Sequence, residues 1–169
     1  MDTYRLDADL RWLSAAIELS RCCAPSPAAY SVGALLVGAD GSVLSTGYSR
    51  ETDPADHAEE VALARIGLPS LPGLPGLPDG FGGFGGEPPP GATLYSSLEP
   101  CAVRASRPTP CADLIIASGI CRVAIAWTEP PILAPGGGAG RLRAAGVEVV
   151  VIPELADAAR QVNAHLLGE

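Results

Sequence analysis

The chain has 169 residues, of which 47% are hydrophobic, and its formal net charge is −8 at pH 7. This length suits a single domain (residues 1–169) with a substantial core, and no apolar run approaches the roughly 20 residues that span a bilayer. Because a nucleic-acid binder needs a cationic surface, the acidic balance favours a small-molecule partner over nucleic acid. The N-terminus lacks a secretory signal, so we expect a cytoplasmic protein with no membrane partner.

The first part of the chain predicts a helix followed by a hairpin. Apolar residues recur at helical spacing over residues 6–23 and predict an amphipathic helix. Two short apolar runs follow at 32–38 and 42–47. The turn signal Asp40-Gly41 lies between them, so we expect two antiparallel strands.

A second helix is expected over residues 57–65, and a low-complexity segment follows it at 68–91. Proline and glycine dominate this segment, so no regular element is expected there. The simplest interpretation is an exposed loop insertion. The alternative is a lid over a pocket, with Phe81 and Phe84 reaching inward.

The rest of the chain alternates strands with helices. Strands are expected over 92–98, 122–127 and 147–152, and helices over 110–118, 141–145 and 153–167. Alternating elements imply an α/β protein in three layers, α/β/α, with helices on both faces of one sheet. Because parallel neighbours need a crossover, strands four and five of this five-stranded mixed sheet should run parallel.

Two segments carry a metal-binding pattern: His57-Ala58-Glu59, and Pro100-Cys101 through Pro110-Cys111. A catalytic zinc needs three protein ligands and one open position for water. His57, Cys101 and Cys111 supply one imidazole and two thiolates, and helix N-termini favour the thiolate form. The pattern therefore predicts one zinc ion per chain.

Glu59 lies two residues after His57 and is not needed as a ligand. In the first helical turn its carboxylate can point toward a zinc-bound water and move a proton from that water to the substrate. H-x-E followed by P-C-x-x-C is the signature of zinc deaminases; here the first half matches outright, and the second half matches with a longer gap between Cys101 and Cys111. Each half alone is weak evidence, since Cys111 also fits a buried helix cysteine.

The other cysteines and the second histidine have plainer interpretations. Cys22 and Cys23 fall in the last turn of the expected first helix, as core or surface thiols. Cys121 begins an expected buried strand, where we predict a packing role. His165 lies near the C-terminus, where we predict a solvated side chain.

The segments HAEEVAL, GATLYSSLEPCAVRASRPTPCADLIIASGICRVAIAWTEP and LRAAGVEVV resemble the cytidine deaminase-like superfamily, and most of all the pyrimidine deaminase domain of the bifunctional riboflavin-biosynthesis enzyme. The resemblance implies the cytidine deaminase-like fold, the zinc ligands named above, and Glu59 as proton shuttle. It implies substrate binding by the backbone at Ala58 and Cys101 and by Arg107. It also implies at least a homodimer. We expect only the deaminase part, without a reductase domain.

Three features depart from that family. Nine residues separate Cys101 from Cys111, where the riboflavin enzymes usually have eight. Ala29 stands where they carry an asparagine, and Ser49 where they carry a histidine. The segment 52–57 instead resembles nucleobase and tRNA-adenosine deaminases.

The leading hypothesis is hydrolytic deamination of an aminopyrimidine, either free or as a ribosyl phosphate. The alternatives are a deaminase of cytidine, deoxycytidylate, cytosine or guanine, and an inactive zinc-stabilised binding scaffold. Ser49 and Trp127 are further candidates for substrate contact. Arg104 and Arg107, with hydroxyls from Ser106 and Thr109, either bind a phosphate or pair with acidic side chains.

Overall fold

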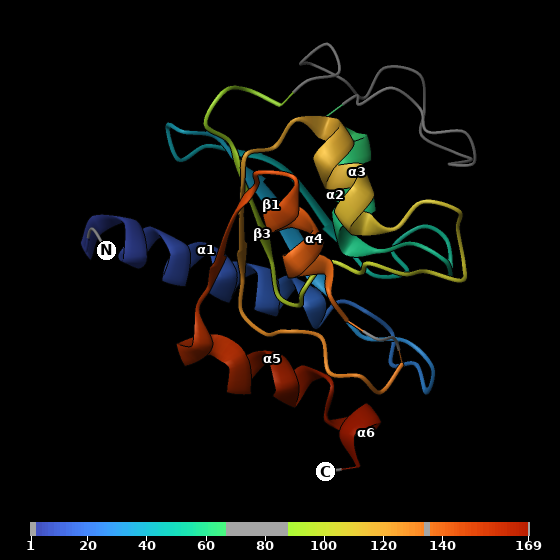
Figure 1. Cartoon of the computed structure of the whole chain (residues 1–169). Coiled ribbons are helices and arrows are strands. Elements are labelled where there is room, and N and C mark those ends of the chain that lie inside the picture. Colours follow the sequence, from blue (N-terminus) through green and yellow to red (C-terminus); the bar gives the residue numbers. More distant parts are fainter. Residues whose placement is uncertain (1–2, 67–87, 134–135, 169) are drawn as a thin grey trace.

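The computed structural model describes residues 3–66, 88–133 and 136–168. Its centre is a five-stranded mixed sheet in the order β2-β1-β3-β4-β5 (Figure 1). The strands are β1 Gly33–Val37, β2 Val43–Tyr48, β3 Thr93–Ser96, β4 Arg122–Ile125 and β5 Glu148–Val151. β1 pairs antiparallel with β2 and β3, whereas β3–β4 and β4–β5 are parallel pairs. The predicted mixed sheet and its parallel fourth and fifth strands are confirmed.

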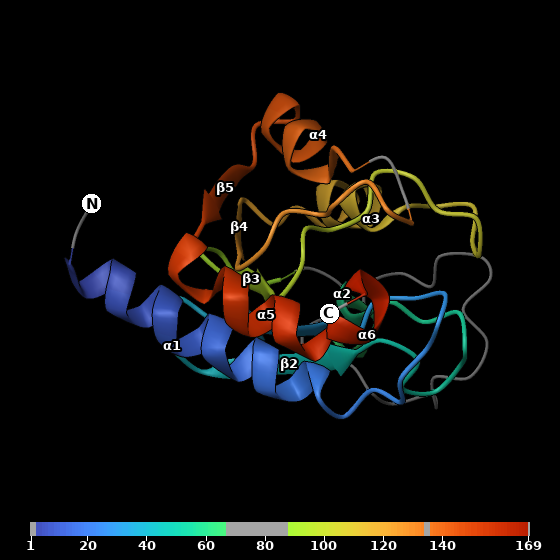
Figure 2. The same cartoon turned by 90° about the horizontal axis from the view of Figure 1, so that it is seen from below.

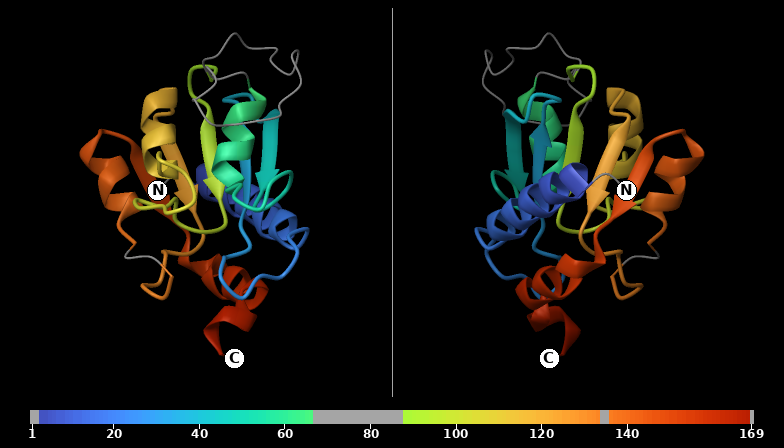
Figure 3. Two further views of the ribbon diagram at one scale, coloured as in Figure 1. Left: turned by 90° about the vertical axis from the view of Figure 1, so that its right-hand side faces the viewer. Right: turned by 90° about the vertical axis from the view of Figure 1, so that its left-hand side faces the viewer.

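Helices cover both faces of the sheet, as the alternation of elements predicts. The helices are α1 Thr3–Ser20, α2 Ala58–Arg65, α3 Cys111–Ser118, α4 Gly138–Ala144, the 3-10 turn η1 Pro153–Leu155, α5 Ala156–Val162 and α6 Ala164–Leu167. α2, α3 and α4 lie side by side on one face, and α1 and α5 lie on the other (Figures 2 and 3). β1, β3 and β4 are buried along their whole length because both faces are covered.

A buried ion pair joins α1 to the centre of the sheet. Both guanidinium Nη atoms of Arg122 on β4 donate to the Asp9 carboxylate on α1, at 2.9 and 2.7 Å. The Tyr95 hydroxyl on β3 donates to the same carboxylate at 3.0 Å. All three side chains are buried, so this network fixes α1 in one position across two strands.

A glycine brings the start of α2 against the sheet. A Cβ atom at Gly47 on β2 would lie 2.4 Å from the carbonyl oxygen of Ala58 and 2.7 Å from the amide nitrogen of Ala62. Only glycine allows this approach. The N-terminal turn of α2, which carries His57 and Glu59, is positioned by this contact.

Several boundaries differ from the sequence predictions. The first helix ends at Ser20, so Cys22 and Cys23 follow it in a turn instead of lying in its last turn. Cys121 precedes β4 and is exposed, so the predicted packing role is wrong. α4 begins at Gly138, three residues before the predicted start of the helix over 141–145, and ends at Ala144.

The helix predicted over 153–167 is divided into η1, α5 and α6, and the division at Asn163 has a tertiary cause. The Asn163 amide accepts a hydrogen bond from the Ser31 amide at 2.7 Å and donates to the Ser31 carbonyl at 3.1 Å. The C-terminal helices are thereby held against the segment that precedes β1. His165 is exposed, as expected, with its Nε2 atom 3.0 Å from the Ser26 carbonyl.

The lid hypothesis for Phe81 and Phe84 concerns residues outside the described part of the chain. Only 88–91 of the predicted 68–91 insertion are described. Among the described helices, none combines the length and apolar character needed to cross a bilayer.

Candidate active site

His57, Cys101 and Cys111 converge at one end of the sheet. His57 immediately precedes α2, Cys101 lies in the loop after β3, and Cys111 is the first residue of α3. The His57 Nδ1 atom lies 3.6 Å from the Cys101 sulfur and 3.4 Å from the Cys111 sulfur. All three potential ligand atoms lie within 4.8 Å of one another.

These distances fit a tetrahedral zinc ion. Zinc bonds of about 2.0–2.1 Å to nitrogen and about 2.3 Å to sulfur place such ligands about 3.5–3.6 Å apart. One imidazole and two sulfurs leave the fourth position for a water or a substrate atom. The predicted zinc site is therefore assembled by residues from three different elements.

The two sulfurs interact directly, and this interaction shifts their pKa values in opposite directions. The hydrogen bond from the Cys111 thiol, with further help from His57, lowers the pKa of Cys101 to about 4. The Cys111 amide also donates to the Cys101 sulfur at 3.3 Å. The same sulfur–sulfur contact, together with burial, raises the pKa of Cys111. Without a metal the pair keeps one proton, which a zinc ion would displace on binding.

Glu59 lies beside this cluster and is almost completely buried. The Ser96 hydroxyl at the end of β3 donates to its Oε1 atom at 2.8 Å. Burial raises the pKa of the Glu59 carboxyl above its ordinary value. A buried carboxyl of raised pKa that Ser96 holds in place has the properties of an acid–base group that both accepts and returns a proton.

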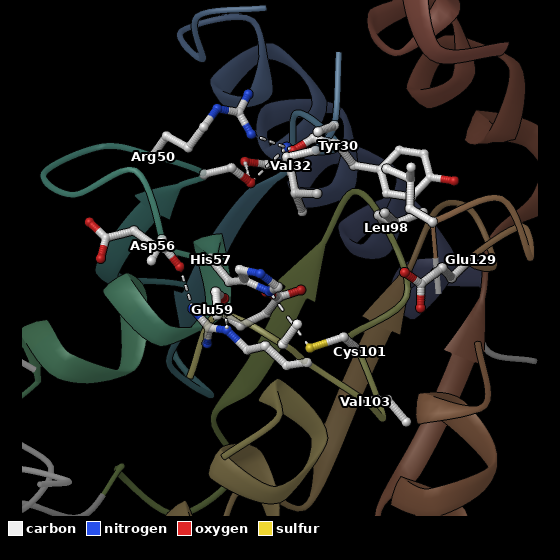
Figure 4. Close-up of a pocket in the computed structure, with 18 of the residues that line it drawn as sticks. Tyr30, Val32, Arg50, Asp56, His57, Glu59, Leu98, Cys101, Val103 and Glu129 are labelled. Atoms are coloured by element: carbon white, nitrogen blue, oxygen red, sulfur yellow. Dashed lines mark hydrogen bonds between the residues drawn. The ribbon is translucent and has the colours of Figure 1, made fainter. Parts of the chain in front are cut away.

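A cavity of about 370 Å³ opens beside the cluster, and His57, Glu59 and Cys101 form part of its wall (Figure 4). Tyr30, Val32 and Leu98 provide an apolar side. This size matches small-molecule sites, which combine apolar walls with a few polar groups.

Glu99 organises the loop that carries Cys101. Its two carboxylate oxygens accept hydrogen bonds from the amides of Glu129 at 2.9 Å and Ala139 at 2.7 Å. A Cβ atom at Gly138 would lie 1.7 Å from the Pro100 carbonyl oxygen. The loop before Cys101 is thus packed directly on the start of α4.

Glu129 also lines the cavity, and its Oε2 atom is buried without a hydrogen-bond partner among the described residues. Burial, reinforced by the negative charges of Cys101 and Glu99, raises the pKa of its carboxyl to about 7. A buried polar atom without a partner in a cavity wall is a candidate for ligand contact.

The two arginines between the cysteines face carboxylates. Arg104 Nη2 lies 2.7 Å from Glu60 Oε2 and also donates to the Ala55 carbonyl. Arg107 lies 2.9 Å from Asp56 and 3.0 Å from Glu60 through its Nη2 and Nε atoms. Both arginines therefore pair with acidic side chains in the structure.

The remaining predicted contact residues lie in different places. Ser49 and Arg104 line the cavity, whereas Ala58, Arg107 and Trp127 do not belong to its wall as the described residues form it. Ala58 is fully buried in the first turn of α2. Trp127 packs edge-on against Tyr30, with ring centroids 5.9 Å apart. It therefore supports the wall from behind.

Sequence reasoning missed Arg50, Glu99, Glu129 and Asn163. Arg50 has a backbone φ of 60° and lies in the cavity wall. Its guanidinium group donates to the carbonyls of Tyr30 at 2.9 Å and Ala24 at 2.7 Å. The contacts of these four residues join segments that lie far apart in the sequence, so no local sequence pattern indicates them.

The α/β/α sheet brings three potential zinc ligands together beside a buried carboxylate, which are the groups that zinc-dependent hydrolytic chemistry requires. Residues 6–127 match the family model of the cytidine and deoxycytidylate deaminase zinc-binding region, and the chain belongs to this family. Family membership supports zinc as the metal of the His57, Cys101 and Cys111 site.

The chain is similar to deaminases of riboflavin biosynthesis. It is 33% identical over 135 residues to the diaminohydroxyphosphoribosylamino-pyrimidine deaminase of Schizosaccharomyces pombe, covering 80% of this chain and 30% of that protein. The Acinetobacter baumannii RibD structure (form 2) has a TM-score of 0.75 and 29% identity, over 97% of this chain and 40% of that chain. The Aspergillus oryzae Rib2 deaminase in complex with DARIPP has a TM-score of 0.67 and 26% identity, over 96% of this chain and 100% of that chain.

Proposed function

We propose that this chain is a zinc-dependent hydrolytic deaminase of an aminopyrimidine related to the intermediates of riboflavin biosynthesis. The observation that carries the proposal is the buried Glu59 carboxylate, which faces a cavity beside three zinc-ligand side chains. A purely structural zinc site has no use for an uncoordinated acid next to an open position. This argument also speaks against an inactive scaffold.

In the proposed reaction, water replaces the amino group of the ring and ammonia leaves. A zinc ion at this site would supply the Lewis acid that activates water for attack on the amino-bearing carbon. Glu59 takes a proton from the attacking water and passes it to the ring nitrogen. It then carries the second proton of the water to the departing amine. Ser96 holds the carboxylate in place for both transfers.

The named activities of the relatives support an aminopyrimidine, while the family description also covers cytidine and deoxycytidylate. Ala29 and Ser49 both lie in the cavity wall, where the riboflavin enzymes carry an asparagine and a histidine. These two differences favour a substrate that differs from that of the riboflavin enzymes. We further propose a small-molecule substrate rather than nucleic acid, a homodimer or higher homo-oligomer, and a cytoplasmic location.

An ammonia-release screen tests the proposal. Zinc-loaded protein is incubated with a diaminopyrimidine ribosyl compound, cytidine, deoxycytidylate, cytosine and guanine. We expect release from the diaminopyrimidine, lost on chelation and restored by zinc. Preference for cytidine or deoxycytidylate would favour the alternative activity. Release from none of the compounds would contradict the proposal.

A further inference from the structure

Two arginines and three carboxylates form a closed cluster next to the zinc-ligand residues: Asp53, Asp56, Glu60, Arg104 and Arg107. Within it, Arg107 contacts all three acids, the most distant being Asp53 at 3.5 Å. Arg104 contacts Glu60, and both side chains are almost completely buried. Two guanidinium charges therefore face three carboxylate charges.

Hydrogen bonds as well as the arginines hold the buried carboxylates of this cluster. Asp56 is almost completely buried and is held by the neighbouring segment 52–53. Its Oδ2 atom accepts from the Thr52 hydroxyl at 2.6 Å and from the Asp53 amide at 2.8 Å. The cluster as a whole is negative, and it does not offer an unpaired cation to an anionic ligand.

The rest of the chain does not supply the missing positive charge. All eleven basic residues are arginines, and none falls in the undescribed residues 1–2, 67–87, 134–135 and 169. Among the described residues, the charged side chains that line the cavity are Arg50 and Arg104, against the four acids Asp56, Glu59, Glu99 and Glu129.

Arg50 is directed away from the zinc ligands, toward the segment that precedes β1 (Figure 4). Its terminal nitrogens donate to two backbone carbonyls and to the Ser31 hydroxyl at 3.2 Å. It thus holds the cavity wall together and has few donors left for a ligand.

A phosphate group carries up to two negative charges, and proteins often bind it through arginine or lysine side chains that are not already paired. In this cavity a phosphate could reach the Arg104 guanidinium only next to Glu60, which already pairs with it, and would otherwise lie among carboxylates. Like charges in contact are strongly unfavourable at a binding surface. The uncharged parts of a substrate meet better partners, because Arg104 Nη1 and Glu129 Oε2 are both buried without hydrogen-bond partners among the described residues.

We propose that this site takes an unphosphorylated aminopyrimidine, as a free base or a ribosyl compound, and discriminates against the 5′-phosphate. The inference rests on the proposed deaminase activity and departs from the phosphoribosyl substrate in the name of the S. pombe relative. Discrimination comes from the paired state of Arg104 and Arg107.

Matched substrate pairs test this inference. The kcat/KM for ammonia release is measured for the diaminopyrimidine riboside and its 5′-phosphate, and likewise for cytidine and cytidine 5′-phosphate. We expect the unphosphorylated member to be favoured by about tenfold or more, because of like-charge repulsion. Equal or higher kcat/KM for the phosphate would overturn the inference and leave the deaminase proposal intact.

A pair of variants tests whether the charge of this cluster causes the discrimination against the 5′-phosphate. Asp53→Asn removes one negative charge from the cluster, while Asp7→Asn removes the same charge from an exposed position on α1. We expect Asp53→Asn to reduce the discrimination about threefold or more, in line with an attenuated charge effect at a partly exposed group. Asp7→Asn should leave it unchanged. An unchanged preference in Asp53→Asn, or equal changes in both variants, would overturn the role of the cluster.

Ribose 5-phosphate provides a readout that does not depend on turnover. It is titrated by calorimetry into the zinc-loaded protein. We expect no saturable binding below about 1 mM, the range of weak association. Saturable binding in that range would overturn the inference, even if no substrate releases ammonia and the proposed function itself fails.

Discussion

The hydroxyl of Ser96 donates a 2.8 Å hydrogen bond to the carboxylate of Glu59, and both side chains are buried. Ser96 is the last residue of β3, and Glu59 is in the first turn of α2. The bond holds the Glu59 carboxylate in one position within its buried site. Ser96 is thus a positioning residue for the proposed proton transfer.

Ser96→Ala should lower kcat more than it changes KM. A hydrogen bond to a charged group contributes about 1.5–3 kcal/mol, so we expect a fall in kcat of roughly 10- to 100-fold. Ser97→Ala is the matched control, because Ser97 is equally buried but accepts from the Gly33 amide at 3.1 Å. Similar kcat losses in the two variants would show that Ser96 has only a structural role.

Glu59→Gln removes the proposed acid–base group while keeping the size of the side chain. Zinc content and substrate binding should persist, while kcat falls by roughly two to four powers of ten. Steady-state kinetics and metal analysis on the same preparation check this. Glu18→Gln, at an exposed position on α1, is the control for a lost charge. Turnover close to that of the wild type would remove Glu59 from the mechanism.

Cys101→Ser and Cys111→Ser should each lose the zinc ion and destabilise the fold, because metal binding contributes to folding free energy. We expect about one zinc per chain in the wild type and little in either variant. Metal analysis and thermal denaturation measure both effects. Cys22→Ser and Cys121→Ser change exposed thiols and should keep the metal. Full zinc retention in the first two variants would contradict the ligand assignment.

The strands and the metal ligands were predictable because their signals are local. The run 32–38 contains β1, and His57-Ala58-Glu59 marks both a helix start and a ligand. The partners of Arg104 and Arg107 were not predictable, since a basic residue in an acidic chain has many candidate partners. Only the three-dimensional arrangement brings Glu60 and Asp56 to them.

The end of the chain shows the same limit. A continuous helical pattern over 153–167 predicts one helix, yet the chain is interrupted at Asn163. The Asn163 amide binds the backbone of Ser31, 132 positions away, and no periodicity in either segment indicates this contact. Local propensity was overridden by a tertiary hydrogen bond.

Gly47→Ala should displace α2 and the ligand that precedes it. The added Cβ would lie 2.4 Å from the Ala58 carbonyl, and forced overpacking typically costs about 1–3 kcal/mol of stability. Because His57 and Glu59 move with α2, activity should fall together with stability. Gly140→Ala is the control, since its Cβ meets nothing within 4 Å in α4. There, alanine should be neutral or stabilising by about 0.5–1 kcal/mol. Denaturant melts and kinetics compare the two, and a Gly47→Ala protein of normal stability would contradict the packing argument.

Tyr95 should make the fold sensitive to alkaline pH. Burial, and then the Asp9 charge that its hydroxyl contacts, raise the pKa of Tyr95 to about 12. In the unfolded chain it ionises near pH 10, as free tyrosine does. A raised folded-state pKa gives a contribution to stability that is complete below about pH 10 and is lost as the pH rises toward 12. The slope from this one group is at most about 1.4 kcal/mol per pH unit.

Tyr95→Phe removes that titration, so its free energy of unfolding should fall less steeply with pH than that of the wild type between about pH 10 and 12. At neutral pH the variant should be less stable by about 1.5–3 kcal/mol, because Asp9 loses a hydrogen-bond donor. Denaturant unfolding across this pH range, with zinc present throughout, measures both effects. Tyr4→Phe changes a tyrosine that is 84% exposed and should keep the wild-type slope. If Tyr95→Phe also kept that slope, Tyr95 would ionise near its ordinary pKa, and the Asp9 network would not hold it in the neutral form.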